Sequence, residues 1–262
     1  MAGKVVFIGA GPGDPELLTV KAVKYLSQAE VVVYAGSLVN AEVLKYARQD
    51  AEVYNSASMV TEEIVKLMIQ KAREGKLVAR LKSGDPSIYG ALWEEIIPLQ
   101  LAGIEYEIVP GVTAALAAAA QLRIELTVPK RVQHVVITRA SHRVPMRGSL
   151  KDVADFILKT GAVAVIYTGV HVIDKVVKEL EEGGLSPGTP VAVVYKATWP
   201  DQKIIQGTLR DIAEKVKAER IVRDAVIIVG ESVQPPEIPR SAVYNPDHAH
   251  SYRPRRELRE DA

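Results

Sequence analysis

Three short apolar runs in this sequence each end in a turn that contains glycine. The first turn is "GAGPGDP" (9–15), the second is "SGDP" (83–86) and the third is "PG" (110–111). Because the carboxyl ends of parallel strands meet at one edge of an open α/β sheet, we expect the three turns to lie together where such sheets bind ligands. They predict a pocket with a floor of backbone, capped by Asp85.

The first turn matches a dinucleotide-binding turn only in part. That fingerprint needs G-x-G-x-x-G and an acidic residue ending the second strand, but Asp14 stands at the third glycine position and "VVVYAGSLV" (31–39) has no acid. The G-K-[ST] of a P-loop is also missing. Asp14 followed by Pro15 is typical of a helix N-cap. A nucleotide-binding oxidoreductase is therefore disfavoured, while a tight turn without a ligand stays open as the structural interpretation.

Composition excludes several classes of function. The 262 residues include 33 Lys and Arg against 32 Asp and Glu, so no net field attracts nucleic acid or an anionic membrane. The absence of cysteine excludes disulfides, thiolate metal sites and a cysteine nucleophile. No basic-then-apolar leader and no long apolar stretch is present. We expect a cytoplasmic protein without nucleic acid or membrane partners.

Strand-like runs alternate with helical patterns along the chain. The predicted strands are 4–8, 30–34, 77–81, 104–109, 132–138, 163–167, 191–196, 203–207 and 225–230. The predicted helices lie near 15–28, 40–48, 60–74, 87–102, 112–122, 149–160, 171–183 and 208–219. This alternation is typical of an α/β fold with a mostly parallel sheet. The pair 191–196 and 203–207 is better explained as a hairpin than as a crossover.

The pattern changes partway along the chain, which predicts two α/β domains with a cleft between them. We place the N-terminal domain with its glycine-rich turns at 1–125 and the C-terminal domain at 126–233, with 123–131 as a linker. Residues 234–262 are rich in proline and charge, so we expect an extended or partly disordered tail.

Three long stretches of the chain resemble the signatures of one family, the tetrapyrrole methylases. They are "VVFIGAGPGDPELLTVKAVKYLSQAEVVVYAG" (5–36), "RLKSGDPSIYGALWEE" (80–95) and "VPGVTAALAAAA" (109–120). The resemblance implies an S-adenosylmethionine-dependent enzyme with the class III methyltransferase fold, in which the methyl donor lies in the cleft between two α/β domains. It also implies an anionic tetrapyrrole substrate, a homodimer, and a first glycine turn that faces the tetrapyrrole trough.

Two stretches are similar to the family members that methylate carbon 11 of precorrin-4 or its cobalt complex. They are "YAGSLVNAEVL" (34–44) and "VVYKATWPDQKIIQGTL" (193–209), and "SAVYNPDHAHSYR" (241–253) resembles the ending of those members. Gly36 and Ser83 depart from the family pattern, since an acid and a second glycine are common there. Methylation of another tetrapyrrole, such as uroporphyrinogen III or precorrin-2, or of a non-tetrapyrrole target stays open.

The resemblance also implies which residues bind the two substrates. Those expected to contact the methyl donor are Pro12, Ser83, Gly84, Asp85, Ile88, Tyr89, Thr113, Ala114, Tyr167, Thr168, Ala197 and Gly230. Those expected to contact the tetrapyrrole are Gly11, Gly13, Asp14, Lys82, Arg139 and Lys196. Further basic candidates for its carboxylates are Arg131, Arg143 and Arg147, although each basic side chain alone is more often a solvated surface charge.

The sequence identifies no catalytic side chain for this chemistry, and none is required. A sulfonium donor and a nucleophilic ring carbon react through alignment and desolvation, so we expect no bound metal and name no general base. His248 and His250 lie in the polar tail without further ligands, so metal binding by this pair is disfavoured. Trp93 and Trp199 are expected to be packing residues, with Trp199 a candidate for the trough wall.

Overall fold

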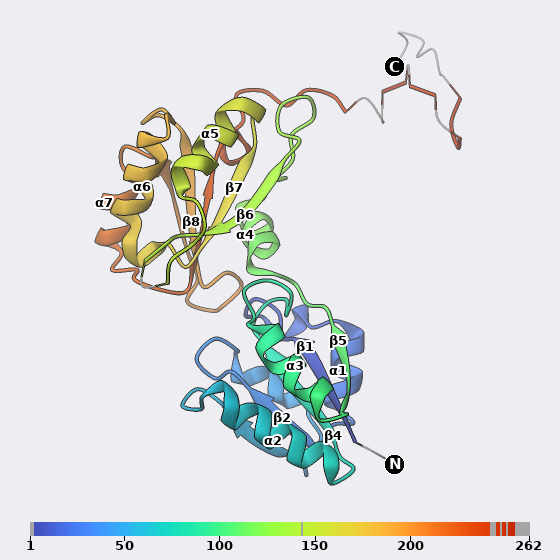
Figure 1. The fold of residues 1–262 in the computed structure, drawn as a ribbon. Helices are drawn as coiled ribbons and strands as arrows, with labels where there is room; N and C mark the ends of the chain where they lie inside the picture. The colour runs from blue at the N-terminus through green and yellow to red at the C-terminus, as the bar shows by residue number, and fades with distance from the viewer. Residues whose placement is uncertain (1–2, 143, 242–244, 247, 250, 255–262) are drawn as a thin grey trace. The chain divides into compact units, whose positions relative to one another are not determined.

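The computed structural model describes residues 3–142, 144–241, 245–246, 248–249 and 251–254 (Figure 1). The described chain divides into two compact units, each with its own five-stranded sheet. The first unit runs up to Gln121 and includes Lys196–Lys203, and the second comprises Leu122–Tyr195 and the chain from Ile204 onward. The fold is mixed α/β, as predicted. Among the described residues, no helix combines the length and the apolar character that crossing a membrane requires.

The first unit is built on a parallel sheet with the strand order β3-β2-β4-β1-β5. Its strands are β1 (Lys4–Gly9), β2 (Val31–Tyr34), β3 (Glu52–Asn55), β4 (Leu77–Lys82) and β5 (Glu105–Val109). Strand β3 was not predicted, because it is an edge strand with alternating exposed and half-buried residues and no apolar run. The central strands β1 and β4 carry the first two glycine-rich turns at their carboxyl ends.

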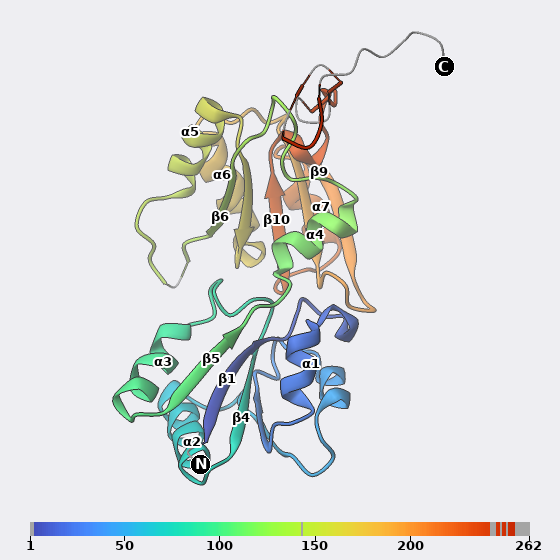
Figure 2. The same cartoon turned by 90° about the vertical axis from the view of Figure 1, so that its right-hand side faces the viewer.

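Helices cover both faces of this parallel sheet, as its two apolar faces require (Figure 2). Helix α1 (Val20–Leu26) packs on one face, whereas α2 (Thr61–Arg73) and α3 (Leu92–Leu101) pack on the other. The segment Ala41–Tyr46 is a 3-10 helix, and α4 (Ala114–Leu122) follows β5. Helix α3 begins later than the predicted residue 87 because Tyr89 and Ala91 have positive φ values of 51° and 48°.

The second unit has a mixed sheet with the order β6-β7-β10-β8-β9. Its strands are β6 (Val135–Arg139), β7 (Val163–Tyr167), β8 (Pro190–Tyr195), β9 (Lys203–Thr208) and β10 (Ala225–Val229). Strands β6 and β7 are parallel, while β10 runs antiparallel to β7 and β8. Strands β8 and β9 are hydrogen-bonded neighbours, which confirms the predicted hairpin.

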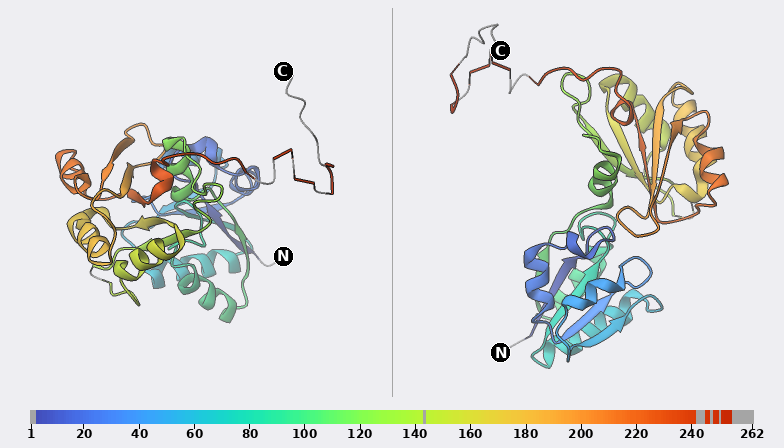
Figure 3. Two further views of the ribbon diagram at one scale, coloured as in Figure 1. Left: turned by 90° about the horizontal axis from the view of Figure 1, so that it is seen from above. Right: turned by 180° about the vertical axis from the view of Figure 1, so that it is seen from behind.

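Three helices cover one face of the second sheet and complete its core. They are α5 (Leu150–Thr160), α6 (Ile173–Glu182) and α7 (Ile212–Ala218), the yellow-green to orange helices of Figure 3. Each contributes buried side chains that meet the sheet, such as Ala154, Leu180 and Val216. The capping box of Ser149 and Asp152 starts α5, and Gly161, with a φ of 68°, ends it.

A buried cluster of charges joins β4 to α3 in the first unit. Arg80 and Glu95 are each 3% exposed and form a bidentate ion pair, with Nε to Oε2 at 3.0 Å and Nη2 to Oε1 at 3.1 Å. Lys82, 6% exposed, pairs with the same carboxylate. Arg80 Nη1 also donates to Ser56 Oγ at 2.9 Å. One buried carboxylate therefore compensates two buried cations at the strand end that carries the second glycine-rich turn.

Replacement of Glu95 by glutamine should destabilise the protein strongly, since it leaves Arg80 and Lys82 buried without a counter-charge. We expect a loss of about 3–5 kcal/mol in the free energy of unfolding. Urea titration followed by circular dichroism measures this loss. The matched control is Glu94→Gln on the exposed side of the same helix, with an expected change within about 0.5 kcal/mol. Equal effects of the two substitutions would show that the cluster does not stabilise the fold.

Candidate active site at the glycine-rich turns

The three glycine-rich turns meet at the carboxyl edge of the first sheet, where their backbones are in direct contact. A Cβ on Gly9 would lie 2.5 Å from the nitrogen of Gly111, and a Cβ on Gly111 would lie 2.2 Å from the oxygen of Gly84. The Gly11 N–H donates to Gly84 O at 3.3 Å, and the Gly84 N–H donates to Gly11 O at 2.9 Å. No side chain fits at Gly9 or Gly111, so glycine is required at both for the turns to come together.

Asp85 links the second turn to the third. Its Oδ2 accepts from the Gly111 N–H at 2.9 Å, and its Oδ1 accepts from the Ser87 N–H at 2.8 Å. The second contact is the local capping interaction typical of an Asp before proline. The first crosses between the turns after β4 and β5, so the carboxylate holds the two turns in register.

The first glycine turn uses its backbone to hold the segment Lys196–Lys203. Trp199 Nε1 donates to Pro12 O at 2.8 Å, and the Asp14 N–H donates to Thr198 Oγ1 at 2.9 Å. Asp14 Oδ1 caps the following 3-10 helix by accepting from the Glu16 N–H at 2.9 Å. A dinucleotide site would instead direct such N–H groups at a phosphate. The interactions of this turn therefore contradict the oxidoreductase alternative.

Several residues predicted to bind the two substrates have a strained backbone. Tyr89, Thr168 and Lys196 have φ values of 51°, 50° and 46°, and Thr198, which was not among the predicted residues, has a φ of 72°. Positive φ is unfavourable for residues with a Cβ, above all for the β-branched threonines. Such conformations persist where the surrounding structure imposes them, and they are common at ligand sites.

The predicted basic residues are held by partners within the protein. Lys82 is buried against Glu95, and burial lowers its pKa from the ordinary lysine value although Glu95 acts in the opposite direction. Arg139 donates to the oxygens of Val144 and Pro145 at 3.0 and 2.6 Å. A substrate carboxylate must therefore share or replace these partners.

Lys196 is held from two sides. Its Nζ lies 2.6 Å from Asp201 Oδ2 and 5.3 Å from the centre of the Trp199 ring. The ion pair lowers the pKa of Asp201. Of the further candidates, Arg131 pairs with Glu231 at 2.8 Å, Arg147 is exposed, and Arg143 lies outside the described residues.

In the second unit, the predicted residues lie at opposite edges of the sheet. Arg139 ends β6 opposite Tyr167, and Thr168 follows Tyr167, so these three share the carboxyl edge of the parallel pair. Gly230 follows β10, which runs antiparallel to β7, and a Cβ there would contact Val163 at the other end of β7. The structure therefore does not bring Gly230 together with Tyr167 and Thr168.

The remaining predicted residues lie in or beside the three turns or, for Ala197, on the segment that packs against the first turn. Pro12 and Ala197 are buried, and Ser83, Ile88, Thr113 and Ala114 are half-buried. At the edge of the second sheet that carries Arg139, the ring centres of His142 and His171 lie 4.9 Å apart. This pair was not predicted, because the two residues are far apart in the chain. Within the described ranges, no cluster of three or more His, Asp or Glu could hold a metal. His250 lies outside those ranges.

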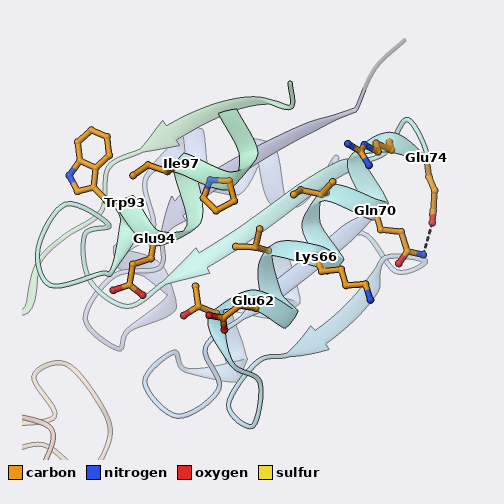
Figure 4. Close-up of a pocket in the computed structure, with 12 residues that line it drawn as sticks. Glu62, Lys66, Gln70, Glu74, Trp93, Glu94 and Ile97 are labelled. Carbon is orange, nitrogen blue, oxygen red and sulfur yellow. Dashed lines mark hydrogen bonds between the residues drawn. The ribbon is translucent and has the colours of Figure 1, made fainter. Parts of the chain in front are cut away.

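A groove of about 1030 Å³ lies elsewhere in the first unit, between α2 and α3 (Figure 4). It is lined by Val65, Ile69 and Ile97, with Trp93 at one end. None of the predicted site residues lines it. Trp93 is 71% exposed, so the expectation that it is a packing residue was wrong. Sequence spacing shows which residues share a face of α3 with Trp93, because they lie one helical turn away. It does not show whether another element covers that face.

The chain is similar to known proteins over most of its length. The model of the tetrapyrrole (corrin/porphyrin) methylase family matches residues 4–213. A relative from Methanocaldococcus jannaschii, named cobalt-precorrin-4 C(11)-methyltransferase, is 51% identical over 95% of this chain and 96% of its own.

Solved structures show the same similarity. An X-ray structure described as a cobalamin biosynthetic enzyme, cobalt precorrin-4 methyltransferase, is 43% identical, with a TM-score of 0.85 over 88% of this chain and 96% of its own. A uroporphyrin-III C-methyltransferase from Thermus thermophilus, complexed with S-adenosylhomocysteine, is 33% identical, with a TM-score of 0.74 over 88% of this chain and 94% of its own. This chain belongs to the tetrapyrrole (corrin/porphyrin) methylase family.

Proposed function

We propose that the chain transfers a methyl group from S-adenosylmethionine to carbon 11 of precorrin-4 or its cobalt complex, in the biosynthesis of cobalamin. The observation that carries the proposal is the 51% identity to a cobalt-precorrin-4 C(11)-methyltransferase over nearly the full length of both chains. A uroporphyrinogen-III C-methyltransferase from the same organism, Methanocaldococcus jannaschii, is less similar in sequence, at 40% identity. The Thermus thermophilus enzyme is also less similar in fold, with a TM-score of 0.74 against 0.85 for the cobalt precorrin-4 methyltransferase. Carbon 11 is therefore favoured over the carbons of uroporphyrinogen III.

The methyl donor of this proposal is S-adenosylmethionine, and the complex of a relative with S-adenosylhomocysteine supports it. In this chain the joined turns lie beside half-buried apolar side chains such as Ile88 and Ala114, which suit the adenine of the donor. Asp85 would act by holding the turns after β4 and β5 in register.

The reaction moves a methyl cation equivalent from the sulfonium sulfur to an electron-rich ring carbon. The new carbon–carbon bond forms as the sulfur–carbon bond breaks, and the electron pair stays on sulfur, so no protein nucleophile is needed. Rigid placement of the two reactants supplies most of the rate, because well-aligned intramolecular reactions gain about 7–11 kcal/mol. The strained turns and the multiply bonded glycine loop provide such rigidity.

The tetrapyrrole substrate carries acetate and propionate carboxylates, which basic side chains would bind. Lys196 and Arg139 are ordered before any ligand arrives, since each already has partners in the protein. Any cobalt belongs to the substrate in this proposal. By resemblance to the family, we also propose that the protein is a cytoplasmic homodimer.

Replacement of Asp85 by alanine should weaken donor binding, because it frees the Gly111 N–H and lets the turns after β4 and β5 separate. We expect affinity for S-adenosylhomocysteine to fall about 10-fold, measured by isothermal titration calorimetry. Asp14→Ala is the matched control, since the carboxylate of Asp14 caps only a local 3-10 helix. Equal losses in two folded variants would show that Asp85 has no special role in the donor site.

The unmodified protein should transfer labelled methyl from the donor to precorrin-4 or cobalt-precorrin-4, and mass spectrometry should find one added methyl group. Carbon-13 NMR of the product should place the label on carbon 11 alone. Uroporphyrinogen III, supplied in parallel, should stay unmethylated. Methylation of uroporphyrinogen III with precorrin-4 untouched would contradict the assignment of the substrate.

A further inference from the structure

Gly13 lies directly beneath the indole of Trp199. A Cβ on Gly13 would lie 2.1 Å from Cδ1 and 2.4 Å from Nε1 of the ring, and its three nearest atoms would all belong to Trp199. The φ of Gly13 is not in the left-handed region, unlike that of Gly11 at 72°. Alanine could therefore adopt the backbone conformation of Gly13 without strain. Glycine is needed at this position because of the indole.

The indole is one of several contacts that fix the segment Lys196–Lys203. Trp199 donates from its ring to Pro12 O, and Thr198 accepts from the Asp14 N–H. Gln202 Oε1 accepts from the Thr198 N–H at 2.6 Å, and Gln202 Nε2 donates to Gln121 Oε1 at 3.2 Å. Two hydrogen bonds thus hold the segment to the glycine loop, and the flat indole makes an apolar contact over Gly13.

These contacts surround a strained stretch of backbone. Lys196 and Thr198 have positive φ values of 46° and 72°, and Ala197, which lies between them, is 5% exposed. A β-branched residue adopts this conformation only where other interactions impose it. Trp199 follows immediately, its N–H donates to Lys196 O at 3.0 Å, and its ring lies under the Lys196 ammonium. The indole ring is therefore positioned to hold Lys196–Thr198 in the strained turn.

We propose that Trp199 is a positioning residue for methyl transfer. Its indole, seated on Gly13, holds Lys196–Thr198 in the strained turn and so fixes Lys196 and Ala197 beside the glycine-rich turns. The inference rests on the proposed function, since it concerns the rate of that reaction. It assigns Gly13 a role as the seat of the indole rather than as a contact of the substrate.

A double-mutant cycle of Gly13→Ala and Trp199→Ala tests this role, with kcat for methyl transfer as the readout. Each single substitution should lower kcat about 100-fold, the scale of a misplacement of about 1 Å. The double variant should be no slower than Trp199→Ala alone, because a Cβ at position 13 is harmless once the ring is gone. If the kcat losses of the two single variants multiply in the double variant, Gly13 and Trp199 act independently and the proposal is wrong.

Conservative variants separate positioning from stability. Trp199→Phe keeps a flat ring on Gly13 and loses only the N–H to Pro12 O, so kcat should recover to within about 10-fold of the unmodified protein. Trp93→Phe, at the exposed tryptophan, should leave kcat unchanged. If Trp199→Ala lowers the unfolding midpoint in urea but retains kcat, Trp199 is a structural residue only, and the proposal is wrong.

Fluorescence reports the seating of the ring independently of activity. The chain has two tryptophans, so Trp93→Phe leaves Trp199 as the sole indole. Addition of Gly13→Ala to that variant should shift the emission to longer wavelength as the ring moves into water. A shift with full kcat would overturn the positioning role while the proposed function stands. An unmodified protein that methylates neither precorrin-4 nor its cobalt complex would overturn both.

Discussion

Direct contact between backbones, at Gly9, Gly84 and Gly111, is the constraint on which the candidate active site depends. A Cβ on Gly9 or Gly111 would approach backbone atoms to between 2.2 and 2.8 Å, so no other residue allows the turns after β1, β4 and β5 to join. Asp85 and the paired hydrogen bonds of Gly11 and Gly84 then lock this arrangement. The parallel sheet brings the strand ends to one edge, and glycine lets them touch.

Close packing on a glycine also explains the position of the segment Lys196–Lys203. Although it connects β8 to β9, its contacts place it in the first unit, where it packs on the glycine loop. The absence of a Cβ at Gly13 makes room for an indole rather than for a phosphate. A motif that resembles a nucleotide-binding turn therefore serves here as a docking surface for another part of the chain.

Charge in this protein is arranged mainly by internal pairing. Glu95 compensates both Arg80 and Lys82 in the interior, and Asp201 holds Lys196. The buried pairs of Glu95 contribute little net stability compared with apolar packing, but they are costly to break. Under the proposed function, a polyanionic substrate would meet cations whose positions are already set, which limits the conformational entropy lost on binding.

Local sequence determined most of the strands, the convergence of the glycine-rich turns and the family, because periodicity and turn chemistry depend on neighbouring residues. It did not reveal the edge strand β3, the start of α3 or the exposure of Trp93, which depend on what covers each face. The burial of Lys82 and the placing of Gly230 at the far edge of its sheet follow from packing and strand direction. Only the tertiary structure seats Trp199 on Gly13, since nothing near either residue specifies so distant a partner.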